Sequence, residues 1–414
     1  MQPLQSVRVL DLSRLLPGPF CTLVLSDLGA QVDKVEDPFV GDYLRLFPPL
    51  AAGQGGAPGL SGRFVALNRD KRSLCLDLKK PAGKEALLRL VSHYQVLVES
   101  FRPGVMDRLS LSCETLWQHN PALVVCSISG YGQTGPYKDR AGHDLNYAAL
   151  SGVLSLCGAK VADPPHPLPI QLADLGAGGL WAAIGILAAL RKAEQTGQGS
   201  HIDLSMCEGT TSFLLPEFGN RFARDEEGEA GGSGNGNQNG TAEGTGRGED
   251  TLTGGVACYG VYRTADGGFL SVGALEPKFW ANLCHVLGRQ GDPSELVAPP
   301  AEQERLREEL QAIFLKKTRA EWEALFAQAD ACVEPVLSPE EVVTHPLHVA
   351  RKLVFDGRKE TGEAPLWQVR TPLRPVDQPC ERPPVLGQHS RAILTEAGFS
   401  EAEINALFAQ NIAR

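Results

Sequence analysis

The 414-residue sequence lacks the motifs of most metal-, nucleotide- and disulfide-dependent proteins. Its ten cysteines are scattered singly without a C-x-x-C pair, which indicates reduced thiols that fill apolar space. No H-E-x-x-H motif, cysteine cluster or EF-hand loop occurs, so we predict no metal site. A G-x-G-x-x-G motif after the first strand, a P-loop and a G-x-S-x-G motif are also missing, which leaves NAD, ATP and serine-hydrolase chemistry without support.

Basic charge and long apolar runs are scarce as well. The chain has 39 basic and 49 acidic residues, a formal net charge of −10, and no basic run that would follow a nucleic acid backbone. The longest uncharged apolar run, 175–190, is short and rich in Gly and Ala, so we expect a buried helix there. No basic and apolar leader precedes the first strand. We therefore expect a cytoplasmic protein with no nucleic acid or membrane partner.

The first third of the chain alternates β-rich segments with helical ones. Strands are expected at 7–13, 31–37, 95–100 and at the end of 113–129, with helices at 17–29 and 81–94. This alternation predicts an α/β fold with a Rossmann-like parallel sheet. Ligands of such sheets bind beyond the carboxyl ends of the strands. We therefore expect the ligand site at segments that lie at or after these ends, which are 96–104, 124–132 and 141–147.

Composition divides the rest of the chain. Residues 225–250, DEEGEAGGSGNGNQNGTAEGTGRGED, have no apolar periodicity, which is typical of a flexible insert. Residues 1–224 would then form a large domain, and 251–334 a smaller α+β domain that opens with a hairpin turning at 265–268. The segment 335–414, which includes two predicted terminal helices, is expected to rejoin the large domain.

Three side chains near separate backbone turns are candidate acid–base groups. His143 follows a glycine and precedes Asp144, although most histidines are surface or structural residues. Asp174 precedes a Gly-rich helix, where it is equally suited to be an ordinary N-cap. Glu276, next to Pro277, is by itself explained best as a helix cap. Together they would supply two bases that face one carbon, with the second carboxylate shifting the pKa of the first through a shared proton.

Several motifs occur in the order found in one enzyme family. GYGQTGPYKDRAGHDLNYAALSG, LADLGAGG, TADGGFLSVGALEPKFW and DACVEPVL together resemble the class III CoA-transferase (CaiB/BaiF) superfamily, and specifically its α-methylacyl-CoA racemase branch. The resemblance runs from about Val7 to the C-terminal helices and omits the Gly-rich insert. It implies an interlocked homodimer that acts on acyl-CoA in fatty acid metabolism and has no cofactor, because CoA is part of the substrate.

The resemblance implies a role for each candidate base. In the racemase branch, the matching His143 and Asp174 would exchange protons on opposite faces of C2 of a 2-methylacyl-CoA thioester through an enolate, and Glu276 would hold Asp174. In the transferase branch, Asp174 would instead carry aspartyl intermediates while CoA moves between carboxylic acids. That branch usually lacks the histidine of G-H-D, which favours the racemase, although 41–61 is longer than in typical racemases. A catalytically silent acyl-CoA-binding homologue is a third possibility.

The CoA-binding stretches of the family match LDLKK, SFRPGVMDR and GHDLNY. Their basic residues suit phosphate groups, although any one of them alone is typical of solvated surface charge. NRDKRS adds Arg69, Lys71 and Arg72 to the same neighbourhood, and the N–H groups of 142–144 are the expected donors to an enolate oxygen. The CoA-binding residues predicted in this way are Leu76, Asp77, Lys79, Arg102, Arg108, Gly142, Asp144 and Tyr147.

Overall fold

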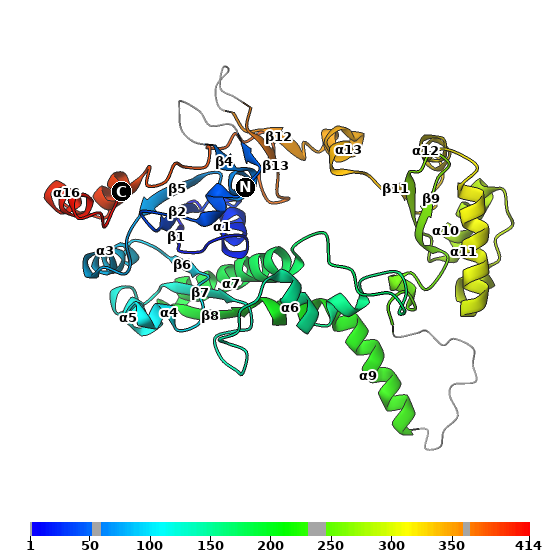
Figure 1. Ribbon diagram of the computed structural model, residues 1–414, viewed down its shortest axis with the longest axis horizontal. Helices are drawn as coiled ribbons and strands as arrows, with labels where there is room; N and C mark the ends of the chain where they lie inside the picture. Colours follow the sequence, from blue (N-terminus) through cyan, green and yellow to red (C-terminus); the bar gives the residue numbers. More distant parts are fainter. Residues whose placement is uncertain (1, 52–58, 231–245, 359–364) are drawn as a thin grey trace. The chain divides into compact units, whose positions relative to one another are not determined.

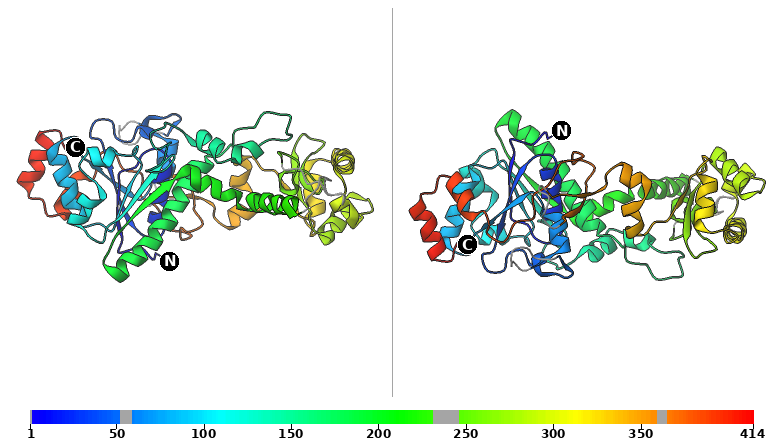
Figure 2. Two further views of the ribbon diagram at one scale, coloured as in Figure 1. Left: turned by 90° about the horizontal axis from the view of Figure 1, so that it is seen from below. Right: turned by 90° about the horizontal axis from the view of Figure 1, so that it is seen from above.

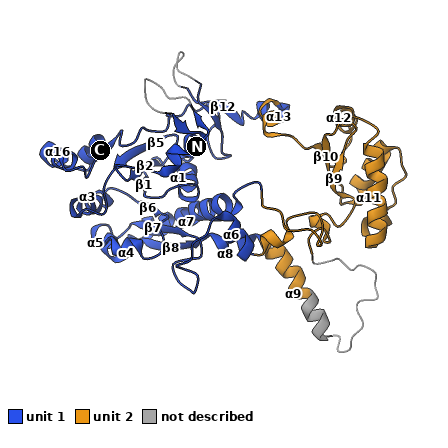
Figure 3. Ribbon diagram, viewed as in Figure 1, with its two compact units in different colours: residues 1–151, 169–213, 345–414 blue, residues 152–168, 214–344 orange. Residues whose placement is uncertain are grey.

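The computed structural model describes residues 2–51, 59–230, 246–358 and 365–414, which belong to two compact units (Figures 1 and 3). Unit 1 comprises 1–151, 169–213 and 345–414, and unit 2 comprises 152–168 and 214–344. The sequence placed domain boundaries at 224 and 335, whereas α9 (Leu215–Ala230) runs without a break across residue 224. Two excursions of the chain, rather than one, therefore build the smaller unit.

Unit 1 is built on a six-stranded sheet in the order β5-β2-β1-β6-β7-β8. All neighbouring strands are parallel, which confirms the predicted α/β fold. The chain adds strands on one side of β1 and then returns to its other side at β6, so the direction of winding reverses between these two strands. The strands are β1 (Arg8–Asp11), β2 (Gln31–Glu36), β5 (Lys71–Cys75), β6 (Val96–Glu99), β7 (Val124–Ser129) and β8 (Ser200–Ser205).

The alternation of side chains along these strands makes two cores, one on each face of the sheet (Figure 2). Val9 and Val98 face α1 (Pro17–Asp27) and α7 (Trp181–Thr196) in the first core, which also contains Cys21 as an apolar filler. Leu10 and Leu97 face the opposite way. The helices of this second core are α3 (Pro81–Val91), α5 (Cys113–His119), α15 (Ser390–Glu396) and α16 (Glu401–Ala409).

The apolar run of the sequence forms one continuous helical segment. A π-helix, η3 (Leu172–Leu180), leads directly into α7, and the combined segment Leu172–Thr196 is long and apolar enough to cross a membrane by length and composition alone. One of its faces, which includes Ile186, is buried against the sheet, as predicted. The other face exposes Leu180, Trp181 and Ile184, so the expectation of a fully buried helix is wrong for this side.

The remaining elements of unit 1 are short and lie mostly in the connections. A small antiparallel pair follows the first βαβ unit, and another joins two parts of the C-terminal segment. These elements are β3 (Leu50–Ala51), β4 (Leu60–Ser61), α2 (Gly62–Leu67), α4 (Val105–Arg108), α6 (Asp144–Leu150), α8 (Met206–Thr211), α14 (Pro346–Ala350), β12 (Val354–Asp356) and β13 (Trp367–Val369).

Unit 2 has its own antiparallel sheet, in the order β11-β10-β9, and its own core around Trp280 and Phe314. The predicted hairpin is confirmed, since β9 and β10 pair across the turn at 264–268. The elements are β9 (Tyr259–Arg263), β10 (Phe269–Gly273), α10 (Pro277–Leu287), α11 (Pro300–Phe314), α12 (Arg319–Phe326), β11 (Val333–Pro335) and α13 (Pro339–Thr344), with α9 given above.

Part of the predicted flexible insert, 225–250, has a defined structure. Residues 231–245 lie outside the described residues. Arg247, in contrast, is buried, and its guanidinium donates hydrogen bonds to the carbonyl oxygens of Ser155, Lys160 and Val161 at 2.7, 2.9 and 3.1 Å. A fourth bond, of 2.5 Å, reaches the carbonyl of Asp163. The C-terminal limit of the insert at residue 250 is therefore wrong, because Arg247 fastens its end to 155–163.

Candidate active site

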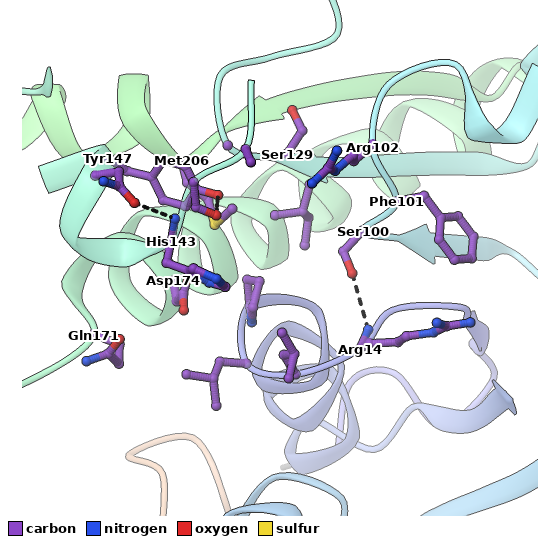
Figure 4. Close-up of a pocket in the computed structure, with 18 of the residues that line it drawn as sticks. Arg14, Ser100, Phe101, Arg102, Ser129, His143, Tyr147, Gln171, Asp174 and Met206 are labelled. Atoms are coloured by element: carbon purple, nitrogen blue, oxygen red, sulfur yellow. Dashed lines mark hydrogen bonds between the residues drawn. The ribbon is translucent and has the colours of Figure 1, made fainter. Parts of the chain in front are cut away.

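A cavity of about 620 Å³ lies at the carboxyl edge of the sheet of unit 1 (Figure 4). It is lined by Arg14 after β1, Arg102 after β6 and Tyr131 after β7. The first two loops flank the point at which the winding of the sheet reverses, and doubly wound sheets bind their ligands at this position. His143 and Asp174, predicted from separate parts of the chain, both line this cavity.

His143 occupies the N-cap of α6, with an extended backbone and an exposed ring that lines the cavity. Its own N–H donates to Oδ1 of Asn146 at 3.0 Å, and the N–H of Asn146 donates back to the carbonyl of His143 at 2.8 Å. This reciprocal cap fixes the backbone from which the imidazole projects. It also engages the N–H of His143, which is therefore not the free donor to an enolate oxygen that the sequence suggested.

Asp174 lies in the first turn of η3, inside the helix rather than just before it. Burial, followed by the nearby charge of Asp144, raises the pKa of its carboxyl to about 7. Its N–H donates to Oδ1 of Asp144 at 2.9 Å. Near neutral pH the Asp174 carboxyl therefore exists in both protonation states, so it can accept a proton and can also return one.

Gly142 and Tyr147 hold the loop that carries His143. The hydroxyl of Tyr147 donates to the carbonyl of Gly142 at 2.5 Å, and its ring meets that of Tyr131 edge-on at 5.2 Å. A Cβ atom on Gly142 would lie 2.6 Å from the Tyr147 ring, so only glycine allows this close approach. Both residues line the cavity, and the contacts between them lie within 142–147. Their contact with CoA stays a prediction.

Two of the basic side chains that line the cavity, those of Arg14 and Arg102, lie away from the two candidate bases. Figure 4 shows Arg14, Phe101 and Arg102 toward one side of the view, with His143 and Asp174 toward the other. The N–H of Arg14 donates to the hydroxyl of Ser100 at 3.2 Å, which joins the loops after β1 and β6. Of the lining cations, the sequence predicted Arg102 alone. Those it missed are Arg14, Arg63, Lys138 and Arg140.

Arg14 was open to prediction, because it directly follows the first predicted strand and therefore stands at the ligand-binding edge of a parallel sheet. The next residue, Leu15, also lines the cavity and has a left-handed backbone with φ of 62°. A leucine is costly in that conformation, so the surrounding contacts must hold this turn in place. Nothing in the sequence pattern indicates this strained turn.

Other predicted CoA-binding residues do not line the cavity. Leu76 is a buried core residue, and Asp77 accepts the N–H of Lys79 at 3.0 Å in the turn before α3. Lys79 and Arg108 are exposed, the latter at the end of α4. These four residues are thus apart from the cavity lining, although all of them lie within the described ranges. Their contact with CoA stays a prediction.

The interpretation of NRDKRS as a phosphate-binding stretch is wrong. Arg69 is fully buried and pairs with Asp27 at 2.6 Å. Lys71 is buried against Asp11, with its Nζ 3.3 Å from the carboxylate. The third cation, Arg72, bridges two carboxylates, those of Asp33 and Glu396, at 2.6 and 2.7 Å. All three cations are paired with carboxylates inside unit 1, so none of them is available to a phosphate group.

Glu276 belongs to unit 2, where it is the N-cap residue of α10. Its side chain is exposed and makes no capping hydrogen bond. Glu276 therefore occupies the predicted cap position, but its carboxylate does not cap the helix. Asp174 belongs to unit 1, and the predicted pairing of these two carboxylates stays a prediction.

Comparison with known proteins agrees with this fold. Residues 4–390 match the model of the family described as CoA-transferase family III. The chain is 40% identical to an α-methylacyl-CoA racemase of Mus musculus, over 99% of this chain and 97% of that protein. It is 30% identical to a succinyl-CoA:glutarate CoA-transferase of the same organism, over 100% of this chain and 90% of the relative.

A solved structure gives the same result. The crystal structure of a CAIB/BAIF family protein from Brucella suis superposes with a TM-score of 0.77 at 28% identity, and the match covers 96% of this chain and 99% of that one. Together with the match across residues 4–390, this likeness establishes that the chain belongs to CoA-transferase family III.

Proposed function

We propose that the chain is a 2-methylacyl-CoA racemase, an isomerase that inverts the configuration at C2 of the acyl group. The observation that carries the proposal is one cavity lined by the imidazole of His143 and by the carboxyl of Asp174, whose pKa is raised to about 7. The racemase from Mus musculus, 40% identical over nearly the whole chain, supports the same activity.

The reaction follows from the two bases. The thioester carbonyl acidifies the C2–H bond, and neutral His143 removes this proton from one enantiomer to leave an enolate. Protonated Asp174 then donates its proton to the opposite face of C2. The other enantiomer reacts in the reverse sense, with ionised Asp174 as base and the imidazolium of His143 as acid. A carboxyl with a pKa near neutrality is suited to both roles.

The remaining parts of the proposal concern the substrate and the assembly. Arg102 and Arg14 would bind the phosphates of the CoA moiety at the other end of the cavity, because guanidinium groups match phosphate geometry. The family resemblance adds the interlocked homodimer, with Glu276 acting on Asp174, and a role in fatty acid metabolism. A cytoplasmic location remains part of the proposal, and sedimentation of the purified chain tests the dimer.

The test is incubation of each enantiomer of a 2-methylacyl-CoA in D₂O without an acceptor acid. The wild-type chain should racemise both and place deuterium at C2. His143→Ala and Asp174→Asn should each lower racemisation by roughly 100-fold or more, while each retains C2 exchange with one enantiomer. Near wild-type racemisation by His143→Ala would show that His143 is not a base.

A CoA-transferase is the second candidate, because the same Asp174 carboxyl lines the cavity and a relative 30% identical is a CoA-transferase. In that case CoA exchange would require an acceptor acid, and hydroxylamine would trap an acyl intermediate that Asp174→Asn lacks. His143→Ala would then weaken turnover only modestly. Binding of acyl-CoA with neither reaction would identify a catalytically silent homologue.

A further inference from the structure

Half of the capping of the first turn of η3 comes from a side chain of another helix. Helices leave their first N–H groups without partners inside the helix. In η3, the N–H of Leu172 donates to the carbonyl of Ile170 at 3.1 Å and that of Leu175 to the carbonyl of Gln171 at 2.9 Å. The two N–H groups between them, of Ala173 and Asp174, donate to the carboxylate of Asp144, with 2.9 Å for the second bond.

The two ends of η3 are therefore held by different means. At its C-terminal end, the helix packs closely on α1, since a Cβ on Gly179 would lie 2.7 Å from the Phe20 ring and 3.1 Å from the carbonyl of Pro17. The first turn, which carries Asp174, is instead held to α6 by the hydrogen bonds to the Asp144 carboxylate. The side chain of Asp144 is 5% exposed, so water does not replace these bonds.

Asp144 is also the charge that acts on Asp174. Burial is the largest cause of the raised pKa of Asp174, and the Asp144 carboxylate is the second. Burial raises the pKa of Asp144 itself, and its two N–H donors oppose this by favouring the ionised form. The titratable groups on the elements packed against η3 are Asp144 and Tyr147 on α6, His143 at its N-cap, Cys207 and Glu208 on α8, Cys21 and Asp27 on α1, His201 and Asp203 on β8, and Arg191, Lys192 and Glu194 on α7.

We propose that Asp144 is a positioning residue, whose carboxylate holds the first turn of η3 against α6 and thereby sets both the place and the charge state of the Asp174 carboxyl. This inference rests on the proposed two-base function. The sequence placed Asp144 among the CoA contacts, but its carboxylate accepts the N–H of Asp174 and is not part of the cavity lining. This role explains why His143 and Asp144 are adjacent in the sequence: His143 supplies one base, and Asp144 positions the other base, Asp174.

Two variants separate position from charge. Asp144→Asn keeps an oxygen acceptor for the N–H of Asp174 and removes the charge, whereas Asp144→Ala removes both. Asp139→Asn is the matched control, because Asp139 is an exposed carboxylate between two lining residues and does not itself line the cavity. The reaction to follow is racemisation of both enantiomers, with kcat and KM measured from pH 5 to 9.

We expect Asp144→Asn to move the limb of the kcat profile that reports Asp174 by roughly one pH unit to the acid side, with kcat at the optimum within about threefold of wild type. Asp144→Ala should lower kcat by roughly tenfold or more while KM changes less than about threefold, and the asparagine variant should restore it. Asp139→Asn should leave the profile unchanged. A profile of Asp144→Asn that superimposes on wild type, or an Asp144→Ala variant as active as wild type, would overturn the proposal.

An infrared titration separates this proposal from the function on which it rests. The difference spectrum between ¹³C-aspartate-labelled wild type and Asp174→Asn isolates the protonated carboxyl band of Asp174 without substrate. The midpoint of this band should lie near neutral pH in wild type and lower in Asp144→Asn. If the wild-type chain does not exchange the C2 proton, the racemase proposal fails. If the band midpoint does not move, the role of Asp144 fails whatever the reaction is.

Discussion

Glu99 makes the stability of unit 1 depend on pH. It ends β6 and is 3% exposed, and its carboxylate accepts the N–H of Phe101 at 2.6 Å and the hydroxyl of Ser127. Burial is the largest cause that raises its pKa, from 4.5 to about 7, and these two bonds only partly oppose it. Between these values the unfolded chain loses the proton and the folded chain keeps it, so stability falls as the pH rises and levels off above pH 7.

Replacement of Glu99 by glutamine removes this dependence. At 1.36 kcal/mol for each tenfold change in proton affinity, the ionised carboxylate opposes folding by about 3 kcal/mol at alkaline pH. Most of this, about 2.5 kcal/mol, develops between about pH 5 and pH 8.5. Glutamine keeps an oxygen that accepts the N–H of Phe101. The free energy of unfolding of Glu99→Gln, relative to that of wild type, should therefore rise by about 2.5 kcal/mol between about pH 5 and pH 8.5.

Urea unfolding at several pH values measures the difference. Glu85→Gln is the control, since Glu85 is an exposed residue of α3 in the same unit. We expect the free energies of unfolding of Glu85→Gln and wild type to stay parallel across the pH range, and those of Glu99→Gln and wild type to diverge above pH 5. A difference between Glu99→Gln and wild type that is the same at every pH would refute the reasoning, because it would mean that Glu99 is ionised in the folded chain throughout.

Three further changes test the site and the second unit. Arg102→Met should raise the KM for acyl-CoA by roughly tenfold or more with kcat nearly unchanged, because it removes a charge-assisted phosphate contact. Arg191→Met, at an exposed arginine of α7 outside the cavity lining, should leave KM within about twofold in steady-state assays. Arg247→Met leaves four carbonyls without their donor, so calorimetry should show unit 2 destabilised by about 2–4 kcal/mol, and an unchanged transition would contradict this structural role. Gly130→Ala places a Cβ 2.5 Å from the Tyr147 ring. It should lower kcat by roughly tenfold, because it displaces Tyr147 and with it the loop that carries His143. An unaltered kcat would mean that this loop tolerates the displacement.

The sheet could be predicted because it depends on local patterns, whereas the presence of His143 and Asp174 at one cavity was implied by the family resemblance of the segments that contain them. Strand and helix alternation predicts a parallel sheet, and the carboxyl ends of parallel strands meet at one edge. Each of the two residues lies in a segment with family motifs, and the structure places both in the cavity lining. Their catalytic roles and that of Glu276 remain predictions.

The failures concern charges whose partners lie far away in the sequence. Arg69 and Lys71 are predicted from the sequence to bind phosphate, but they pair instead with Asp27 and Asp11, which are 42 and 60 residues away. The partner of Asp144, the N–H of Asp174, is 30 residues away. A one-dimensional charge pattern contains no information on such pairing, because neutralisation inside a fold depends on which strands become neighbours. For the same reason, composition alone gave no sign that Arg247 is buried.

The C-terminal helices of unit 1 have a consequence for how the chain is made. The face of the sheet that includes Leu10, Leu97 and Val125 is covered in part by α15 and α16, which follow unit 2 in the sequence and are translated after it. Domains commonly fold during synthesis in order from the N-terminus. Here unit 2 is synthesised before unit 1 has all of its segments. While unit 2 is translated, α15 and α16 are not yet available to cover this apolar face of the sheet. We expect a chaperone to bind the exposed face during this period.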